Sequence, residues 1–121
     1  MTVTDRPAFD MAVSHEKACS IFHLKGRLMD QQQADRLMAT VDGELAKGHK
    51  YAVLDMSELQ YMNSTGLNIM INVLTRTRNA GGDTYIAGVS PSVRQLFTVT
   101  KLDTVFIIVD GVDAALAKLS A

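Results

Sequence analysis

YAVLDMSELQYMNSTGLNIMINVLTRTRNAGGDTYIAGV, residues 51–89, predicts a strand, a helix and a second strand in succession. Residues 51–56 form a short continuous apolar run with a β-branched centre, which is typical of a strand buried on both faces. Apolar side chains then recur at helical spacing over 67–74, and two glycines at 81–82 end the helix. Residues 84–89 predict the second strand. Because such a unit joins parallel strands through a right-handed crossover, the stretch predicts an α/β fold with helices covering a sheet.

The sequence before this stretch predicts two more strands and one more helix. Apolar and polar residues alternate over 9–13 and again over 18–24. This alternation indicates an antiparallel pair of strands near one edge of the sheet, joined by a turn at 14–17. From Asp30 the spacing of apolar residues becomes helical and continues to Leu45, so Asp30 is a candidate N-cap.

The sequence after this stretch predicts a short helix, a last strand and a terminal helix. Ser90 and Pro91 are expected to start the short helix, which runs through residue 97, because serine caps free N–H groups and proline suits the first helical position. Residues 105–109 predict a buried strand, and Asp110 is a candidate N-cap for the terminal helix. The predicted order is β-β-α-β-α-β-α-β-α, with four to five strands and four helices.

Length and composition predict a single domain over residues 1–121, with loose ends at 1–7 and 119–121. The sequence is 47% hydrophobic and 21% charged, which is typical of an ordinary folded protein. Its 12 basic and 13 acidic side chains are interspersed and give a net charge of −1. Since binding to nucleic-acid phosphates requires clustered lysines and arginines, we expect no nucleic-acid partner.

Three features of the sequence bear on the compartment. Cys19 is the single cysteine and cannot form an internal disulfide. The first 20 residues contain acids and no continuous apolar core, unlike a secretory signal. No segment approaches the roughly 18 consecutive apolar residues that a membrane span needs. We therefore expect a cytoplasmic protein that does not insert into a membrane.

The sequence lacks the usual patterns of an enzyme or a metal site. His15, His23 and His49 lie apart without ligand spacing, and we expect a hairpin-turn residue, a strand residue and a turn residue respectively. Ser64 lacks the G-x-S-x-G elbow of a nucleophile, and the glycines within 79–88 match no phosphate-binding loop. We therefore expect no catalytic residue, metal or cofactor. A small nucleotide-binding or hydrolytic domain is the alternative of a different class.

The polar run Asn63-Ser64-Thr65-Gly66 separates an apolar strand from a strongly apolar helix. Its simplest interpretation is a helix cap, in which Asn63 or Ser64 accepts hydrogen bonds from the first turn. The same position suits a modification, because a helix N-terminus favours negative charge and phosphorylation adds about −1.5 to −2. On the residues alone the cap is favoured, since capping serines are common.

Residues 54–106 resemble the bacterial anti-sigma factor antagonist family, whose members are STAS domain proteins. The family pattern is D-S-[ST]-G-L at the start of a helix, then a G-G turn, a strand and S-P-x-V-x-x-L-F. This sequence has NSTGL at 63–67, Gly-Gly at 81–82 and SPSVRQLF at 90–97 in that order, with weaker similarity over 24–37. The resemblance implies a single STAS-like domain with a mixed sheet and helices packed mainly on one face.

The resemblance also implies a partner-switching role in transcription regulation. In such proteins the unphosphorylated antagonist binds an anti-sigma factor, which is also a GHKL-type serine kinase, and the sigma factor is released. Phosphorylation of the serine that matches Ser64 weakens the complex, with Thr65 as the second candidate acceptor, and a PP2C-type phosphatase restores it. ATP and metal then belong to the partner enzymes. The predicted partner contacts are Met29, Met62, Asn63, Ser64, Thr65, Gly66, Leu67, Asn68, Asn72 and Arg76.

Three positions depart from the family pattern. Asn63 replaces an acid directly before the switch serine, and Met29 replaces the acid of G-x-L-D, with Asp30 one position later. Lys101 replaces a common glycine, and at a left-handed position it costs about 1 kcal/mol. The two lost acids keep a second hypothesis open, in which the domain is a STAS interaction module of a signalling or transport complex that is not phosphorylated.

Overall fold

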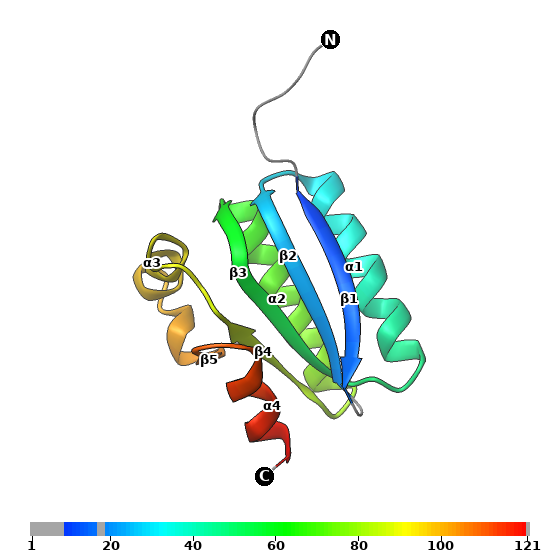
Figure 1. The fold of residues 1–121 in the computed structure, drawn as a ribbon. Helices are drawn as coiled ribbons and strands as arrows, with labels where there is room; N and C mark the ends of the chain where they lie inside the picture. The colour runs from blue at the N-terminus through cyan, green and yellow to red at the C-terminus, as the bar shows by residue number, and fades with distance from the viewer. Residues whose placement is uncertain (1–8, 17–18, 121) are drawn as a thin grey trace.

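The computed structural model of the protein describes residues 9–16 and 19–120. Its element order confirms the predicted β-β-α-β-α-β-α-β-α, with one additional 3-10 turn, η1 (Figure 1). The elements are β1 Asp10–Glu16, β2 Cys19–Leu28, α1 Gln31–Ala46, β3 Tyr51–Met62, α2 Ser64–Asn79, β4 Asp83–Ala87, α3 Pro91–Val99, η1 Leu102–Thr104, β5 Ile107–Val109 and α4 Val112–Ser120.

The five strands form one mixed sheet in the order β1-β2-β3-β4-β5. Strand β1 pairs antiparallel with β2, and all the other neighbours are parallel. The predicted antiparallel pair at one edge is therefore confirmed. Strand β3 is central, which explains why the run at 51–56 is apolar on both faces.

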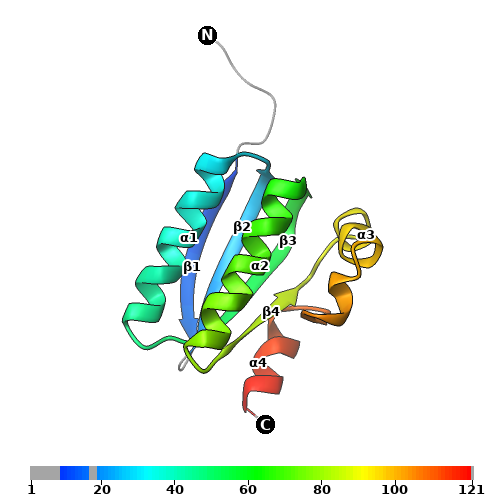
Figure 2. The same cartoon turned by 180° about the vertical axis from the view of Figure 1, so that it is seen from behind.

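Three helices share one face of the sheet. Figure 2 shows α1 and α2 lying across this face, and Val93 and Phe97 of α3 join the same core. Helix α4 packs on the opposite face, where Ala115 joins a smaller core with residues of β2, β3 and β4, among them Val53 and Tyr85. The sheet is thus covered mainly on one side, as the resemblance implied.

Side-chain caps start three of the helices where the sequence predicts them. Asp30 accepts from Gln33 N at 2.8 Å, and the Gln33 side chain accepts from Asp30 N in return, which makes a capping box. Ser90 caps α3 through Val93 N. The fourth cap was predicted wrongly, because α4 begins at Val112 and the cap position falls on Gly111 instead of Asp110.

Several element bounds differ from the prediction. Strand β1 extends through Glu16, so His15 is a strand residue and does not lie in a turn. Strand β3 extends to Met62 because β2 pairs with it along its whole length. Two register shifts in that pairing break the alternation of side chains, which hides the strand over 57–62 in the sequence.

The chain ends and the last strand also differ from expectation. Of the ends predicted to be loose, 1–7 lies outside the described residues, whereas residues 119–120 belong to α4. Strand β5 starts only at Ile107. Lys101 adopts the left-handed conformation, with φ 63° and ψ 19°, so the cost of about 1 kcal/mol for a residue other than glycine applies here.

Candidate functional site

The candidate site is the junction between β3 and α2, at the carboxyl ends of β2 and β3. The β2–β3 register places Leu28 opposite Met62, and Asn63 N donates to Leu28 O at 3.4 Å. The Asn63 side-chain amide then donates to Met29 O at 2.9 Å. Two segments that are 34 positions apart in the sequence therefore meet at Asn63.

Asn63 is the N-cap of α2. Its Oδ1 accepts from Thr65 N at 3.0 Å and from Gly66 N at 3.3 Å. Its Nδ2 donates to Met29 O, which an ionised aspartate could not do because a carboxylate has no donor. The asparagine that departs from the family pattern thus makes a contact that the usual acid would lose.

Ser64 is the first residue of α2, and its side chain is exposed. Because Asn63 already caps the helix, the Ser64 hydroxyl is not needed for the cap. The serine sits where free N–H groups and the helix dipole favour negative charge. A group added to its hydroxyl therefore meets a favourable field without breaking the cap.

Gly66 lets the start of α2 approach the strand ends closely. A Cβ at this position would lie 2.8 Å from Met62 Cβ and 2.9 Å from Leu28 O. Neither atom is the flexible end of a side chain, so any larger residue would push α2 outward. The glycine of the NSTGL motif is therefore required by packing, and it holds Ser64 in place.

The structure divides the predicted partner contacts into two groups. Met62, Gly66 and Leu67 are buried. They therefore support the exposed segment 63–65 from below and offer almost no surface to a partner. The other seven are at least partly exposed, namely Met29, Asn63, Ser64, Thr65, Asn68, Asn72 and Arg76.

Besides Asn63, a second member of the exposed group is engaged within the protein. The Arg76 guanidinium pairs with the Asp42 carboxylate, which joins α2 to α1. Asn68 and Asn72 lie one and two turns beyond Ser64 on the exposed side of α2. The predicted stripe along this helix is therefore on the surface, with its far end tied to α1.

Tyr61, three positions before Ser64, is an exposed aromatic residue that was missed from the sequence. Its side chain is 40% exposed, and Met29 nearby in the register is 37% exposed, which makes them two of the few large apolar side chains on the surface. The Arg27 guanidinium lies 5.4 Å from the centre of the Tyr61 ring. Only the shifted β2–β3 register reveals that Tyr61 points outward.

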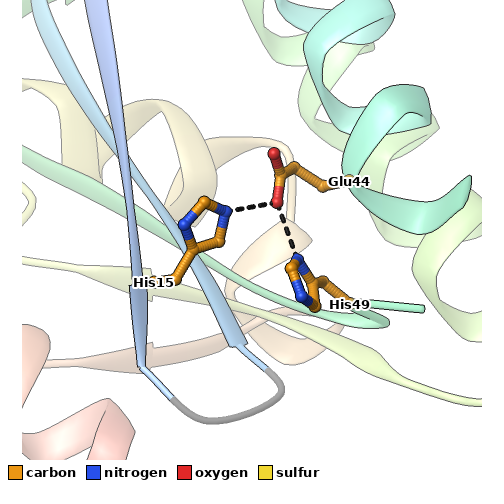
Figure 3. A group of neighbouring side chains, drawn as sticks. All are labelled: His15, Glu44 and His49. Atoms are coloured by element: carbon orange, nitrogen blue, oxygen red, sulfur yellow. Dashed lines mark hydrogen bonds and ion pairs between the residues drawn. The ribbon is translucent and has the colours of Figure 1, made fainter. Parts of the chain in front are cut away.

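The histidines are arranged differently from the expectation that they lie apart. His23 is a strand histidine as predicted, and its ring contacts Asp55 Oδ2 at 2.8 Å and Ser14 Oγ at 2.9 Å. His15 and His49, however, both contact Glu44 at the opposite end of the sheet from Ser64 (Figure 3).

Glu44 also went unnoticed in the sequence, although a signal was present. It follows Leu37 and Val41 at helical spacing, and all three are buried on α1. An acid in an apolar helical stripe requires hydrogen-bond partners, and that requirement could have directed attention to the histidines.

An open hollow elsewhere on the surface bears on the nucleotide-binding alternative. It is lined by Lys25, Glu58, Ser90 and Ser92 among others, and Ser64 is not part of it. Its side chains carry charges of both signs and come from β1, β2, β3 and the start of α3. It has no glycine-rich phosphate loop, so it offers this alternative little support.

Comparison with known proteins identifies the domain type. Residues 10–115 match the STAS domain family. The anti-sigma F factor antagonist of Paenibacillus polymyxa is 26% identical over 108 residues, which cover 88% of this chain and 92% of that protein. In the described part of the chain, none of the helices has the length and apolar character needed to cross a membrane.

Solved structures share the fold at low sequence identity. An anti-sigma factor antagonist from Mycobacterium paratuberculosis superposes with a TM-score of 0.82 at 21% identity, covering 94% of this chain and 96% of that chain. For the anti-sigma factor antagonist SpoIIAA in its unphosphorylated form the TM-score is 0.77 at 18% identity, covering 93% and 96%. For the phosphorylated form of SpoIIAA, from Bacillus, the TM-score is 0.70 at 17% identity, and the match covers 93% of this chain and 99% of that chain.

Proposed function

Because the chain belongs to the STAS domain family, we propose that it is an anti-sigma factor antagonist controlled by phosphorylation of Ser64. In its unphosphorylated form it binds an anti-sigma factor and so releases a sigma factor. The observation that carries this proposal is the exposed Ser64 hydroxyl at the start of α2, directly after the Asn63 cap whose side chain donates to Met29 O.

The surface around Ser64 suits a protein partner. The exposed Met29 supplies apolar area, and methionine side chains are enriched in interface centres. Asn68 and Asn72 extend this surface with amide groups along α2. A partner helix or loop that covers these positions also covers Ser64.

Phosphorylation acts on this surface through charge. A phosphate adds about −1.5 to −2 of charge at Ser64, and burying it in an interface is unfavourable unless the partner supplies a cation. A 100-fold loss of affinity requires only about 2.7 kcal/mol. Local electrostatics is therefore large enough to act as the switch without refolding.

We assign the enzymes of the switch to partners. A GHKL-type serine kinase, which is the anti-sigma factor itself, binds the ATP and metal and phosphorylates Ser64. A PP2C-type phosphatase removes the phosphate again. Ser64 is the preferred acceptor because Thr65 is half-buried, whereas Ser64 is exposed. This chain then acts as substrate and ligand in the cytoplasm, without a cofactor of its own for the switch.

Asn63 and Met29 support a second candidate function. Both replace family acids, so the surface near Ser64 lacks two negative charges that a kinase of this class encounters in typical members. In this alternative the same surface binds a signalling or transport complex permanently, and Ser64 serves only as part of the contact. The two candidates differ in whether phosphate changes binding.

The test combines phosphate mapping with binding. The protein is incubated with the partner kinase and ATP, the modified peptide is identified, and binding to the kinase is measured for wild type and Ser64→Asp. We expect phosphate on Ser64 and about 100-fold weaker binding by Ser64→Asp, in line with about 2.7 kcal/mol. Ser92→Asp is the matched control, because Ser92 is an exposed serine in the first turn of α3.

The control should bind like wild type. If Ser64 receives no phosphate and Ser64→Asp binds like wild type, the switch is refuted and the permanent interaction module is favoured. Equal losses in both aspartate variants would also refute the proposal, because the effect would then follow from added charge anywhere on the surface.

A further inference from the structure

The fold brings three metal-ligating side chains from separate elements to one place. His15 comes from β1, Glu44 from the last turns of α1 and His49 from the loop before β3 (Figure 3). Their ligand atoms all lie within 4.8 Å of one another. His15 Nε2 lies 2.6 Å from Glu44 Oε1, and His49 Nδ1 lies 2.9 Å from the same oxygen.

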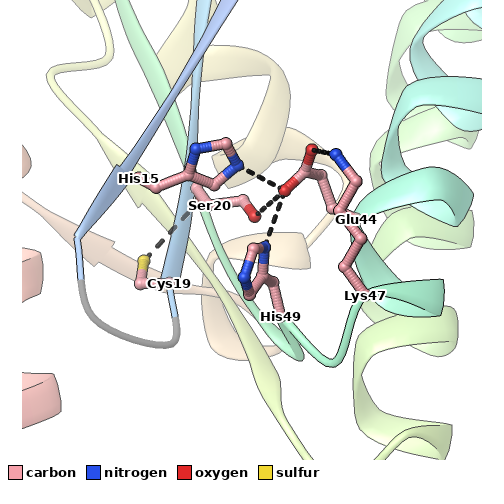
Figure 4. A network of polar contacts seen from close by, with 6 residues as sticks. All are labelled: His15, Cys19, Ser20, Glu44, Lys47 and His49. Atoms are coloured by element: carbon pink, nitrogen blue, oxygen red, sulfur yellow. Dashed lines mark hydrogen bonds and ion pairs between the residues drawn. The ribbon is translucent and has the colours of Figure 1, made fainter.

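Glu44 is held as a buried and oriented carboxylate. Its side chain is only 9% exposed, and Ser20 Oγ donates to Glu44 Oε1 at 2.8 Å (Figure 4). Burial alone raises the pKa of Glu44, but hydrogen bonds from His49, Ser20 and His15 outweigh burial and lower the pKa to about 2. Ser20, His15 and His49 all contact the same carboxylate oxygen, so this oxygen is held facing the two imidazole rings.

This ligand set has a specific chemical preference. Two imidazole nitrogens and one carboxylate oxygen suit zinc and related transition metals, whereas Mg²⁺ prefers an all-oxygen shell. Three protein ligands leave one tetrahedral position for water. The Cys19 sulfur does not complete the set, because it donates to Ser20 O and belongs to the core on the α4 side of the sheet.

The present distances allow a metal ion after a small movement. Zinc–ligand bonds of about 2.0–2.1 Å in a tetrahedron hold ligand atoms about 3.3 Å apart. The contact at 2.6 Å would have to open by about 0.7 Å and the contact at 2.9 Å by about 0.4 Å. His15 is 44% exposed and His49 is 27% exposed, so both rings have room to turn while Glu44 stays fixed.

We propose that His15, Glu44 and His49 bind one Zn²⁺ ion, with water as the fourth ligand. Ser20 is a positioning residue that orients the Glu44 carboxylate. The bound ion joins the edge strand β1, the end of α1 and the start of β3, and so stabilises the end of the sheet that lies away from Ser64.

The test uses the tag-free full-length chain after removal of metal by a chelator. Titration calorimetry with Zn²⁺ should give one ion per chain, and Co²⁺ should give the visible absorption of a four-coordinate site. Excess Mg²⁺ should not compete. Zn²⁺ should also raise the melting temperature, by an amount that grows with the logarithm of the free Zn²⁺ concentration once it exceeds the dissociation constant.

Two variants separate metal binding from simple hydrogen bonding. His15→Gln and His49→Gln keep a side-chain donor for Glu44 but lose the imidazole ligand, so each should weaken Zn²⁺ binding by more than about tenfold. Ser20→Ala should weaken it by about tenfold, the usual effect of losing a group that orients a ligand. His23→Gln is the matched control, because His23 contacts Asp55 and Ser14 instead, and it should bind Zn²⁺ like wild type.

Three outcomes would overturn the site. They are the absence of saturable Zn²⁺ binding, wild-type affinity in both His15→Gln and His49→Gln, or an equal loss in His23→Gln. In the first case the cluster is only a hydrogen-bonded contact between β1 and α1. Because Ser64 takes no part in this experiment, its result does not depend on the switch.

Discussion

The two ends of the sheet hold their polar side chains in different ways. At the Ser64 end the serine is exposed and the cap is made by a neighbour, Asn63, so the hydroxyl is free to change. At the opposite end a single buried carboxylate, Glu44, gathers His15, Ser20 and His49 around one oxygen. We therefore expect charge added at the first end to affect partner binding, and charge removed at the second end to affect the stability of the fold.

The largest expected effect is the acid sensitivity of the Glu44 end. The pKa of Glu44 in the folded protein is about 2 against 4.5 for the free side chain. The charged form therefore favours folding, so its contribution is complete above pH 4.5 and is lost as the pH falls to 2. From this difference we expect a loss of about 3 kcal/mol in the free energy of unfolding. Urea denaturation across this pH range measures it.

Glu44→Gln is the control for this prediction. It should flatten the dependence of stability on pH below 4.5 without abolishing it, because Asp55 also contributes. Burial raises the pKa of Asp55, but hydrogen bonds from His23 and Ser57 outweigh burial and lower it. An unchanged pH dependence in Glu44→Gln would mean that the carboxylate is not coupled to folding, and the contrast between the two ends would disappear.

A smaller expected effect concerns the backbone at the Ser64 end, where Gly66 packs closely against the strand ends. Gly66→Ala places a Cβ against Met62 and Leu28, so we expect it to destabilise the fold by about 1–3 kcal/mol in urea denaturation. Gly43→Ala is the matched control in α1, where a Cβ meets nothing within 4 Å. This control should stabilise the protein by about 1 kcal/mol, because alanine is the better helix former. Equal effects of the two variants would show that the approach of α2 to the strands is not restrictive.

The smallest expected effect is that of Ser64→Asp on stability. An acid in the first turn of α2 meets a favourable dipole, and Ser64 makes no part of the cap. We expect the free energy of unfolding to stay within about 0.5 kcal/mol of wild type, while partner binding falls. A destabilisation well beyond this value would show that Ser64 is coupled to the fold, as Glu44 is.

Much of the fold was predictable because its signals are local. The order of elements, the caps at Asp30 and Ser90, and the edge pair of strands all follow from periodicity and from a few neighbouring residues. The bounds of β3 and the exposure of Tyr61 were not predictable, because two register shifts against β2 interrupt the alternation. One of these shifts lies directly after Gly26, whose φ of 85° is left-handed.

The candidate site was predicted in part. Ser64 lies at the exposed start of a helix, as the motif indicated, but Met62, Gly66 and Leu67 support the loop from below. The helical spacing of apolar residues distinguishes exposed from buried positions well only beyond the first turn of α2. Within the first turn the chain still runs from the strand into the helix. Burial in that turn depends on how closely α2 approaches β2 and β3.

The sequence by itself determined the α/β order, the caps of α1 and α3 and the serine at a helix start. Each of these depends on a few consecutive residues and their backbone preferences. Only the tertiary structure decided that Met29 meets Asn63 and that His15 and His49 meet at Glu44. Those contacts join separate elements, so they depend on strand register and on the packing of α1 against the sheet, which no local pattern encodes.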